Sequence, residues 1–371
     1  MKIVHLMRNE KFTKGIVRFY NKFFNNTEHE IVYYLQKGEP SLVNKEFSIE
    51  QREYRAIKKN GLIPYLKSLK CDYIVLHSLF LTTTESISLL LDQKLLNKIV
   101  WIEWGADLYS WKQEANLRNI VRNYFNGEFR NRIPNIVCIF PPDVDYYRKT
   151  FPKSKSNVFY APYKGYPIDK AFSKYSRESK LEAVKKESNP IYIQIGQNSL
   201  PTLNHIKVLN YLRKYADENI RIFLPLSYGG TKGYVESVSR VAESYFPGKV
   251  IILKDFMDRN EYFKLMNNIS IGIFDTERQC GLGNIHLLSF RNVKLFLSEN
   301  GTMYEYFLKR GVPVEKCESI SNMTFEQFTK VPEVRDKNEF EKYISELSDI
   351  NLAVSLWEKF YKDMREKLNE G

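Results

Sequence analysis

The chain has 371 residues, and its 56 basic and 44 acidic side chains give a formal net charge of +12. This length is more than one ordinary hydrophobic core supports, so it predicts two domains of similar size. The positive charge favours anionic partners such as nucleotide diphosphates and acidic lipid headgroups. Nucleic acid is not expected as a partner, because the basic residues are scattered and no reading motif is present.

The four cysteines lie far apart, which predicts neither a zinc site nor a disulfide framework and favours a reducing cytoplasm. Residues 1–8 are too short in their apolar part for a signal peptide and are typical of a first strand. The most apolar stretch, residues 73–91, is interrupted by His77 and Glu85 and falls short of the ~18–20 apolar residues that span a bilayer. Any membrane contact is therefore expected to be peripheral.

Short apolar runs alternate with helical patterns through the first half, which predicts a parallel, doubly wound sheet. A helix is expected over residues 12–24, after the first run. The runs are residues 3–7, 31–34, 73–76, 99–101, 136–140 and 158–161. Ligands of such sheets bind beyond the carboxyl ends of the strands, so the residues that follow each run are the candidates for function.

Two of these strand ends carry candidate acid–base groups. His77 closes one run and is either a structural histidine or a general base. Asp107 follows a glycine turn between aromatic residues and is either a helix N-cap or a catalytic carboxylate. We rank Asp107 first as the base, His77 second and Glu103 third, because the two-residue strand period turns Glu103 toward the other face of the sheet.

No metal site is expected. Asp143 and Asp145 have Asp-x-Asp spacing, but they follow two prolines in what we interpret as a capped turn. Residues 112–132 form a basic amphipathic helix, which is either a contact with an anionic membrane surface or a solvated face of a helix that packs on the core.

The second half repeats the alternation, with strands expected at residues 191–195, 220–224, 250–253, 269–274 and 293–297. The stretch 164–188, rich in Lys, Ser and Glu, predicts the boundary between the domains. We expect a domain over residues 1–165, a second over 166–345, and a terminal helical segment over 346–371 that can cross back to the first domain.

A glycine-bearing turn follows the expected strand at residues 269–274. Gly281 and Gly283 let the backbone approach a ligand, and the N–H groups of the helix that begins there favour an anion such as a diphosphate. Arg278 adds a positive fork. Gly196, Asn198 and Ser199, which follow the strand at residues 191–195, are expected to face this turn. The alternative is an ordinary strand-to-helix turn without a ligand.

Two α/β halves with these features suggest the GT-B arrangement, in which two Rossmann-like domains with parallel sheets face each other across a cleft. Several motifs also resemble, in the same order, the TDP-N-acetylfucosamine:lipid II N-acetylfucosaminyltransferases of enterobacterial common antigen synthesis. The motifs are Trp104-Gly105-Ala106-Asp107-Leu108-Tyr109, Gly196 with Asn198-Ser199 and Asn204-His205, Pro225 with Tyr228-Gly229, and Arg278-Gln279 with Gly281-Leu282-Gly283.

The resemblance implies a metal-independent, nucleotide-sugar-dependent glycosyltransferase without a further cofactor. It would act at the cytoplasmic face of a bacterial inner membrane and move a TDP-linked N-acetylfucosamine-like sugar to a polyprenyl-diphosphate-linked glycan. It adds Asn204, Tyr228 and Gln279 to the expected donor-binding residues. Asn284, at the end of the glycine-bearing turn, is also expected to bind the donor, although Asn284 and Cys280 replace other residues of the family pattern. Residues 8–13 lack the histidine-rich sequence associated with the family. A soluble or protein acceptor, and a nucleotide-sugar-binding protein without catalysis, are the alternatives.

Overall fold

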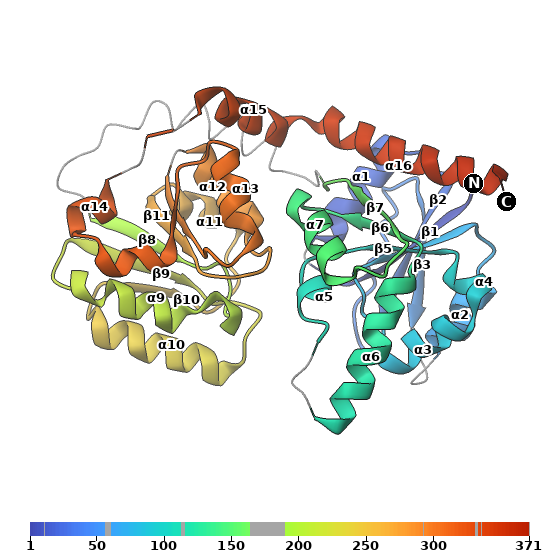
Figure 1. Ribbon diagram of the computed structural model, residues 1–371, viewed down its shortest axis with the longest axis horizontal. Helices are drawn as coiled ribbons and strands as arrows, with labels where there is room; N and C mark the ends of the chain where they lie inside the picture. Colours follow the sequence, from blue (N-terminus) through green and yellow to red (C-terminus); the bar gives the residue numbers. More distant parts are fainter. Residues whose placement is uncertain are drawn as a thin grey trace. The chain divides into compact units, whose positions relative to one another are not determined.

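The computed structural model describes residues 1–10, 12–55, 61–112, 116–163, 190–291, 293–330, 333–334 and 336–370. The chain divides into two compact units, Met1–Ile168 with Asp349–Gly371, and Asp169–Ser348 (Figure 1). The domain boundary predicted near residue 166 lies outside the described residues. Both units are α/β, as the sequence predicts.

The first unit contains a seven-stranded sheet in the order β3-β2-β1-β4-β5-β6-β7, in which all neighbouring strands are parallel. The inner strands are short runs of buried apolar residues because helices cover both faces of the sheet. The strands are β1 (Ile3–Arg8), β2 (His29–Leu35), β3 (Glu50–Arg55), β4 (Tyr73–His77), β5 (Ile99–Ile102), β6 (Asn135–Cys138) and β7 (Asn157–Tyr160).

Two hydrophobic clusters fill the space between this sheet and its helices. One joins α1 (Thr13–Phe23) and the terminal helix α16 (Ile350–Glu370) to one face. The other packs the remaining helices on the opposite face. These helices include α2 (Leu62–Ser68), α3 (Thr83–Leu91), α4 (Gln93–Leu96), α6 (Leu117–Arg132) and α7 (Pro141–Thr150), and a short helix, α5 (Ala106–Tyr109), follows β5.

The structure corrects two predictions in this unit. Residues 141–145, predicted as a capped turn, instead begin α7, because proline is well tolerated in the first turn of a helix. The predictions also miss β3, whose side chains are all exposed or half-buried. It is an edge strand with one neighbour, so it lacks the apolar run that marks a buried strand.

The second unit contains a six-stranded parallel sheet in the order β10-β9-β8-β11-β12-β13. Its strands are β8 (Ile191–Ile195), β9 (Ile220–Pro225), β10 (Val250–Leu253), β11 (Ile269–Phe274), β12 (Lys294–Leu297) and β13 (Val314–Lys316). Its α-helices include α9 (His205–Leu212), α10 (Lys232–Tyr245), α11 (Arg259–Met266), α12 (Leu282–Phe290), α13 (Thr302–Lys309), α14 (Phe325–Thr329) and α15 (Lys337–Ser348). Short 3-10 helices cover Pro201–Leu203, Arg213–Tyr215 and Cys317–Asn322.

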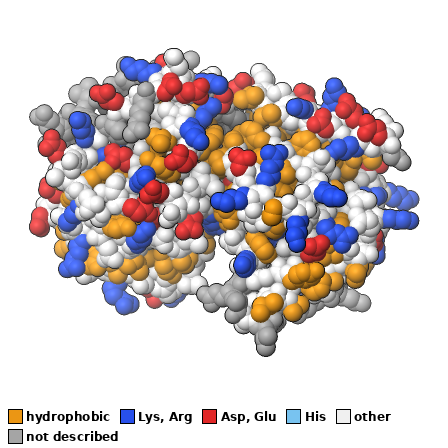
Figure 2. All heavy atoms as spheres, viewed as in Figure 1, with side chains coloured by type: hydrophobic (Ala, Val, Ile, Leu, Met, Phe, Trp, Pro, Cys, Tyr) orange, Lys and Arg blue, Asp and Glu red, His pale blue; other side chains and the backbone are white. Residues whose placement is uncertain are grey.

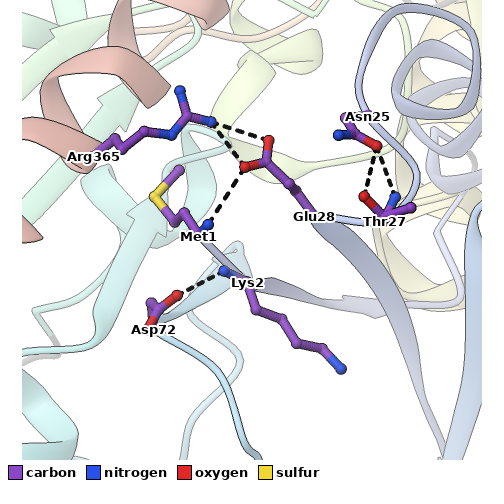
Figure 3. Close-up of polar contacts among 7 residues, drawn as sticks. All are labelled: Met1, Lys2, Asn25, Thr27, Glu28, Asp72 and Arg365. Atoms are coloured by element: carbon purple, nitrogen blue, oxygen red, sulfur yellow. Dashed lines mark hydrogen bonds and ion pairs between the residues drawn. The ribbon is translucent and has the colours of Figure 1, made fainter.

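The terminal helix α16 is attached to the first unit by apolar packing and by polar contacts. Trp357 is fully buried, and its indole N–H donates to the Pro162 carbonyl at 3.0 Å. At the other end of the helix, Arg365 and the amino group of Met1 both reach the Glu28 carboxylate, at 3.0 and 3.4 Å (Figure 3). The last helix of the chain is therefore part of the unit that begins with its first strand.

We predict that apolar packing of α16 dominates its attachment. Trp357→Ala should lower the free energy of unfolding of the first unit by about 3–5 kcal/mol, because it leaves a cavity in the core. Arg365→Ala should cost at most about 1 kcal/mol, since the pair with Glu28 is partly exposed to solvent. Denaturant unfolding measures both. Equal losses in the two variants would contradict this ranking.

Candidate functional site

A cavity of about 350 Å³ lies in the first unit, beyond the carboxyl ends of β1, β4 and β5. It sits where the strand order reverses between β1 and β4, the position at which doubly wound sheets bind ligands. Helix α6 forms one wall. The lining residues include Arg8, Glu10, Ser78, Phe80, Ser86, Trp104, Asp107, Trp111, Arg122, Asn126 and Arg130.

Asp107 is held in this cavity by three N–H donors. One carboxylate oxygen, Oδ2, accepts from the Trp101 indole at 2.7 Å and from the Leu79 backbone at 2.8 Å. The other, Oδ1, accepts from the Trp104 backbone at 2.9 Å. A carboxylate has about four lone-pair positions, so one remains for a ligand. The alternative that Asp107 is a helix N-cap is wrong, because Gly105 occupies that position.

Two further groups hold the turn that carries Asp107. The guanidinium of Arg130, from α6, is buried and donates to the Asp107 carbonyl through Nη2 at 2.9 Å. Gly105 has a φ of 80°, a conformation that glycine adopts without strain. Its N–H donates to the Glu103 carboxyl at 2.7 Å. Contacts from α6 and from the loop after β5 thus position the Asp107 side chain.

Glu103 and Asp143 form a buried acid pair behind this turn. Burial and the negative charge of Asp143 hold the pKa of Glu103 well above its usual range, and burial raises the pKa of Asp143 to about 6. Tyr109 donates to Asp143 at 2.6 Å. Glu103 is fully buried and does not line the cavity, so this arrangement fixes the loop to α7.

His77 lies at the end of β4, and both nitrogens of its ring are occupied. Nε2 bonds to His5 at 3.0 Å and Nδ1 to the Tyr163 hydroxyl at 2.9 Å. His5 in turn bonds to His29 at 2.9 Å. Burial lowers the pKa of His77 to about 3. His77 lines the cavity, but its ring belongs to a histidine chain within the unit, and both ring nitrogens are already hydrogen-bonded to other residues.

Ser78 and Arg8 line the cavity and are not among the candidates that the sequence indicates. Ser78 has a φ of 73°, which is strained for a residue other than glycine and is typical of functional sites. Arg8, at the end of β1, lies over the Phe80 ring at 5.8 Å. The indole nitrogen of Trp104 is also buried and has no hydrogen-bond partner in the described part of the chain. Backbone strain could not be read from the sequence, but the position of Arg8 at a strand end could have been.

In the second unit, the turn between β11 and α12 has the predicted form. Gly281 has a φ of 76° and is the N-cap of α12. A Cβ atom at Gly281 would lie 2.6 Å from Oε1 of Gln197, whose amide donates to the sulfur of Cys280 at 2.7 Å. The turn therefore packs directly against the loop that follows β8.

Polar groups in and around this turn lack partners. The Arg278 side chain is half-buried, and its Nε is a buried atom without a hydrogen bond to any described residue. The same holds for the Thr276 hydroxyl and Oε1 of Gln197. Such groups are rare unless water or a ligand meets them. The start of α12 supplies further N–H donors.

The other predicted donor-side residues lie around the same edge of the sheet. Ser199 donates to the Tyr228 carbonyl at 2.7 Å, and Asn204 donates to the Asp275 carbonyl at 3.1 Å. Gly196 follows β8 with a φ of 63°. Asn284 bonds through its amide to the Tyr262 hydroxyl at 2.9 Å.

The remaining predicted donor-side residues are Gly283, Gln279 and Asn198. Gly283 lies in the first turn of α12, and a Cβ there would meet nothing within 4 Å. Gln279 is half-buried. Asn198 accepts from the Leu200 backbone at 2.9 Å, which shapes the loop after β8.

No group of three or more metal-ligating side chains is present among residues that the structure describes. Within the same ranges, no helix is long and apolar enough to cross a membrane.

The family model described as 4-alpha-L-fucosyltransferase, glycosyl transferase group 56, matches residues 2–340. The chain belongs to this family. The expected resemblance is thereby confirmed, and the chain is a nucleotide-sugar-dependent glycosyltransferase of surface-polysaccharide synthesis.

Solved structures confirm the GT-B fold. Sucrose-phosphate synthase from Thermosynechococcus elongatus has 9% identity and a TM-score of 0.67, covering 99% of this chain and 100% of the other. The UDP-forming α,α-trehalose-phosphate synthase from Burkholderia vietnamiensis has 12% identity and a TM-score of 0.64, with coverage of 99% and 100%. HepE of Anabaena, solved with UDP and glucose, has 11% identity and a TM-score of 0.63, with coverage of 98% and 99%.

The two glycines of the donor-side turn should respond to substitution in opposite ways. Gly281→Ala should destabilise the second unit by about 1–3 kcal/mol, because alanine is strained at positive φ. Gly283→Ala should be neutral or stabilising by up to about 1 kcal/mol, since it fills open space in a helix. Thermal unfolding measures both. Loss of stability in both variants would contradict the open space assigned to Gly283.

Proposed function

We propose that the glycosyltransferase moves a deoxyamino sugar, of the TDP-linked N-acetylfucosamine type, to a polyprenyl-diphosphate-linked glycan. The observation that carries this proposal is the family match over residues 2–340. The second unit binds the donor, and the cavity of the first unit binds the acceptor. Transfer proceeds without a metal ion.

The donor diphosphate is held at the start of α12. Backbone N–H groups there have no partner within the helix, and the helix dipole favours negative charge. Arg278 supplies a cation whose Nε has no partner among the residues that the structure describes. Phosphate oxygens accept hydrogen bonds from the backbone N–H groups of α12 and from Arg278. The same contacts stabilise the diphosphate as it leaves.

Arg278→Ala should weaken binding of a nucleoside diphosphate by about tenfold to a hundredfold, since a hydrogen bond to a charged group contributes about 1.5–3 kcal/mol. Calorimetric titration with thymidine diphosphate and steady-state turnover are the measurements. Arg213→Ala is the matched control, because Arg213 is an exposed cation of the same unit that lies over the Tyr245 ring. Unchanged affinity and turnover in Arg278→Ala would remove the basis for this donor site.

The acceptor occupies the cavity between α6 and the carboxyl end of the first sheet. Arg8 and Arg122 line it and match the charge of a diphosphate. Trp104 and Trp111 offer apolar ring faces to a sugar. The unpartnered indole N–H of Trp104 suits a sugar hydroxyl. This combination fits a glycan linked to a diphosphate better than it fits either part alone.

Asp107 is our proposed base. Its carboxylate lines the cavity, and the lone-pair position left by its three N–H donors can accept the proton of an attacking hydroxyl. His77 is the second candidate, but it would need to leave its bonds to His5 and Tyr163 first. The geometry therefore favours Asp107.

Asp107→Asn should lower kcat by at least ~10²-fold while donor affinity survives. Because Asp107 also holds its turn, Trp101→Phe is the control: it removes one of the three N–H donors and keeps the carboxylate. We expect a much smaller loss in this control. Equal losses would assign Asp107 a positioning role, and near-normal turnover in both Asp107→Asn and His77→Ala would show that the base lies elsewhere. Donor binding without any transfer in the native chain would indicate a binding protein.

The enzyme associates peripherally with an anionic membrane surface through residues 112–132. Helix α6 exposes a cluster of large apolar side chains near its N-terminal end, Ile120, Val121 and Tyr124, which are 56%, 57% and 66% exposed. Hydrophobic side chains gather on the surface over this end of α6, at the lower right of Figure 2. Arg122, on the other side of the helix, is exposed as well. A helix with exposed apolar side chains on one side and a basic residue on the other is typical of one that lies on a bilayer.

Liposome flotation should show stronger binding to anionic than to neutral vesicles, and the difference should shrink in high salt. The double variant Ile120→Ser, Val121→Ser should reduce binding to both. Leu91→Ser is the matched control, because Leu91 is 84% exposed at the end of α3. Equal binding of the native chain to both kinds of vesicle would contradict an electrostatic contact.

A further inference from the structure

Phe256, which follows β10, is an exposed aromatic residue that is not part of the hydrophobic core of its unit. Its side chain is 74% exposed, yet its ring stacks on Tyr228 with centroids 5.7 Å apart and planes 11° apart. A phenylalanine left in water forgoes the free energy of burying its ring. The stacked rings of Phe256 and Tyr228 thus expose a flat aromatic surface to solvent at the carboxyl end of the sheet.

This pair lies beside the loop that carries Ser199. The Tyr228 carbonyl accepts from the Ser199 backbone at 2.8 Å and from its hydroxyl at 2.7 Å. The hydroxyl also accepts from Gly230 N–H at 2.9 Å. The loops after β8 and β9 are therefore fixed to each other. The chain after β9 is likewise fixed to β10, since Leu226 N–H donates to the Leu253 carbonyl at 2.8 Å.

The distance from the aromatic pair to the start of α12 suits a nucleotide whose diphosphate lies at α12. Strands β9 and β11 are separated by β8, which places their ends about 10 Å apart at the usual strand spacing. Tyr262, from α11, packs between these places: its ring contacts Phe223 of β9, and its hydroxyl accepts from Asn284 of α12. One edge of the sheet thus presents an anion site and, two strands away, a flat apolar surface.

We propose that Phe256, supported by Tyr228, stacks against the base of the donor nucleotide. This inference rests on the proposed donor site, because the diphosphate at α12 sets where the base must lie. A parallel aromatic pair is extended by a third flat ring, and a nucleobase is flat whereas a sugar ring is not. Stacking depends on the π-face that every base has, so this contact supplies affinity rather than the choice of base.

The test is titration of nucleoside diphosphates and of inorganic pyrophosphate into variants at position 256. Phe256→Ala should weaken thymidine, uridine and guanosine diphosphate by similar factors, about tenfold, and should leave pyrophosphate unchanged. Phe256→Trp should retain affinity for the three nucleotides. Phe256→Leu, which keeps apolar bulk without a π-face, should resemble Phe256→Ala. Leu91→Ala is the control for loss of an exposed apolar side chain in the other unit.

The outcomes separate this inference from the donor site itself. If Phe256→Ala weakens pyrophosphate as much as the nucleotides, the residue only shapes its loop and the stacking proposal is wrong. If Phe256→Ala changes nothing while Arg278→Ala weakens every ligand, the stacking proposal fails and the donor site stands. If Arg278→Ala weakens neither nucleotide nor pyrophosphate, the donor site fails.

Discussion

In a wholly parallel sheet covered on both faces, every strand ends at the same edge, and the interior leaves little place for polar chemistry. Both units obey this constraint. Their strands are mostly buried apolar runs, and the buried polar groups that interrupt them are bonded in pairs or chains. Lys294, fully buried in β12, donates to the Gln327 carbonyl at 2.8 Å and pairs with Glu315 at 2.9 Å. Hydrogen-bonding groups that can bind a ligand are therefore expected at the strand ends.

The same constraint explains how much of the fold the sequence predicts. A buried strand must be apolar, so runs such as the one now seen in β11 were recognisable, and the helix after β1 had an apolar stripe at helical spacing. Edge strands escape this rule, since one side has no neighbour. The missed strand β3 has the sequence Glu-Gln-Arg-Glu-Tyr-Arg, which no apolar pattern distinguishes from a loop.

For the site, the sequence indicated which strand ends carry candidate polar side chains but not which way each side chain points. Asp107 follows β5 and His77 ends β4, and both line the cavity, but the ring nitrogens of His77 are bonded to His5 and Tyr163 whereas the Asp107 carboxylate keeps a free lone-pair position. The partners of His77 are His5, from β1, and Tyr163, which follows β7, and both are far from it in sequence, so no local pattern revealed them. Phe256 was missed for a related reason, because an exposed aromatic residue gains significance only from the ring on which it stacks.

Helix α6 connects the cavity that we propose for the acceptor to the exposed apolar cluster. Arg122, Asn126 and Arg130 line the cavity, whereas Ile120, Val121 and Tyr124 are exposed. At 100° per residue these two sets lie on opposite sides of the helix. Figure 1 shows the N-terminal end of α6 extending away from the first sheet. A substrate that joins a glycan, a diphosphate and a lipid changes from polar to apolar along its length. Helix α6 is polar on the side of the cavity and apolar on the opposite side, so its two sides match the two parts of such a substrate. One helix can therefore contact the diphosphate in the cavity and the bilayer that holds the lipid.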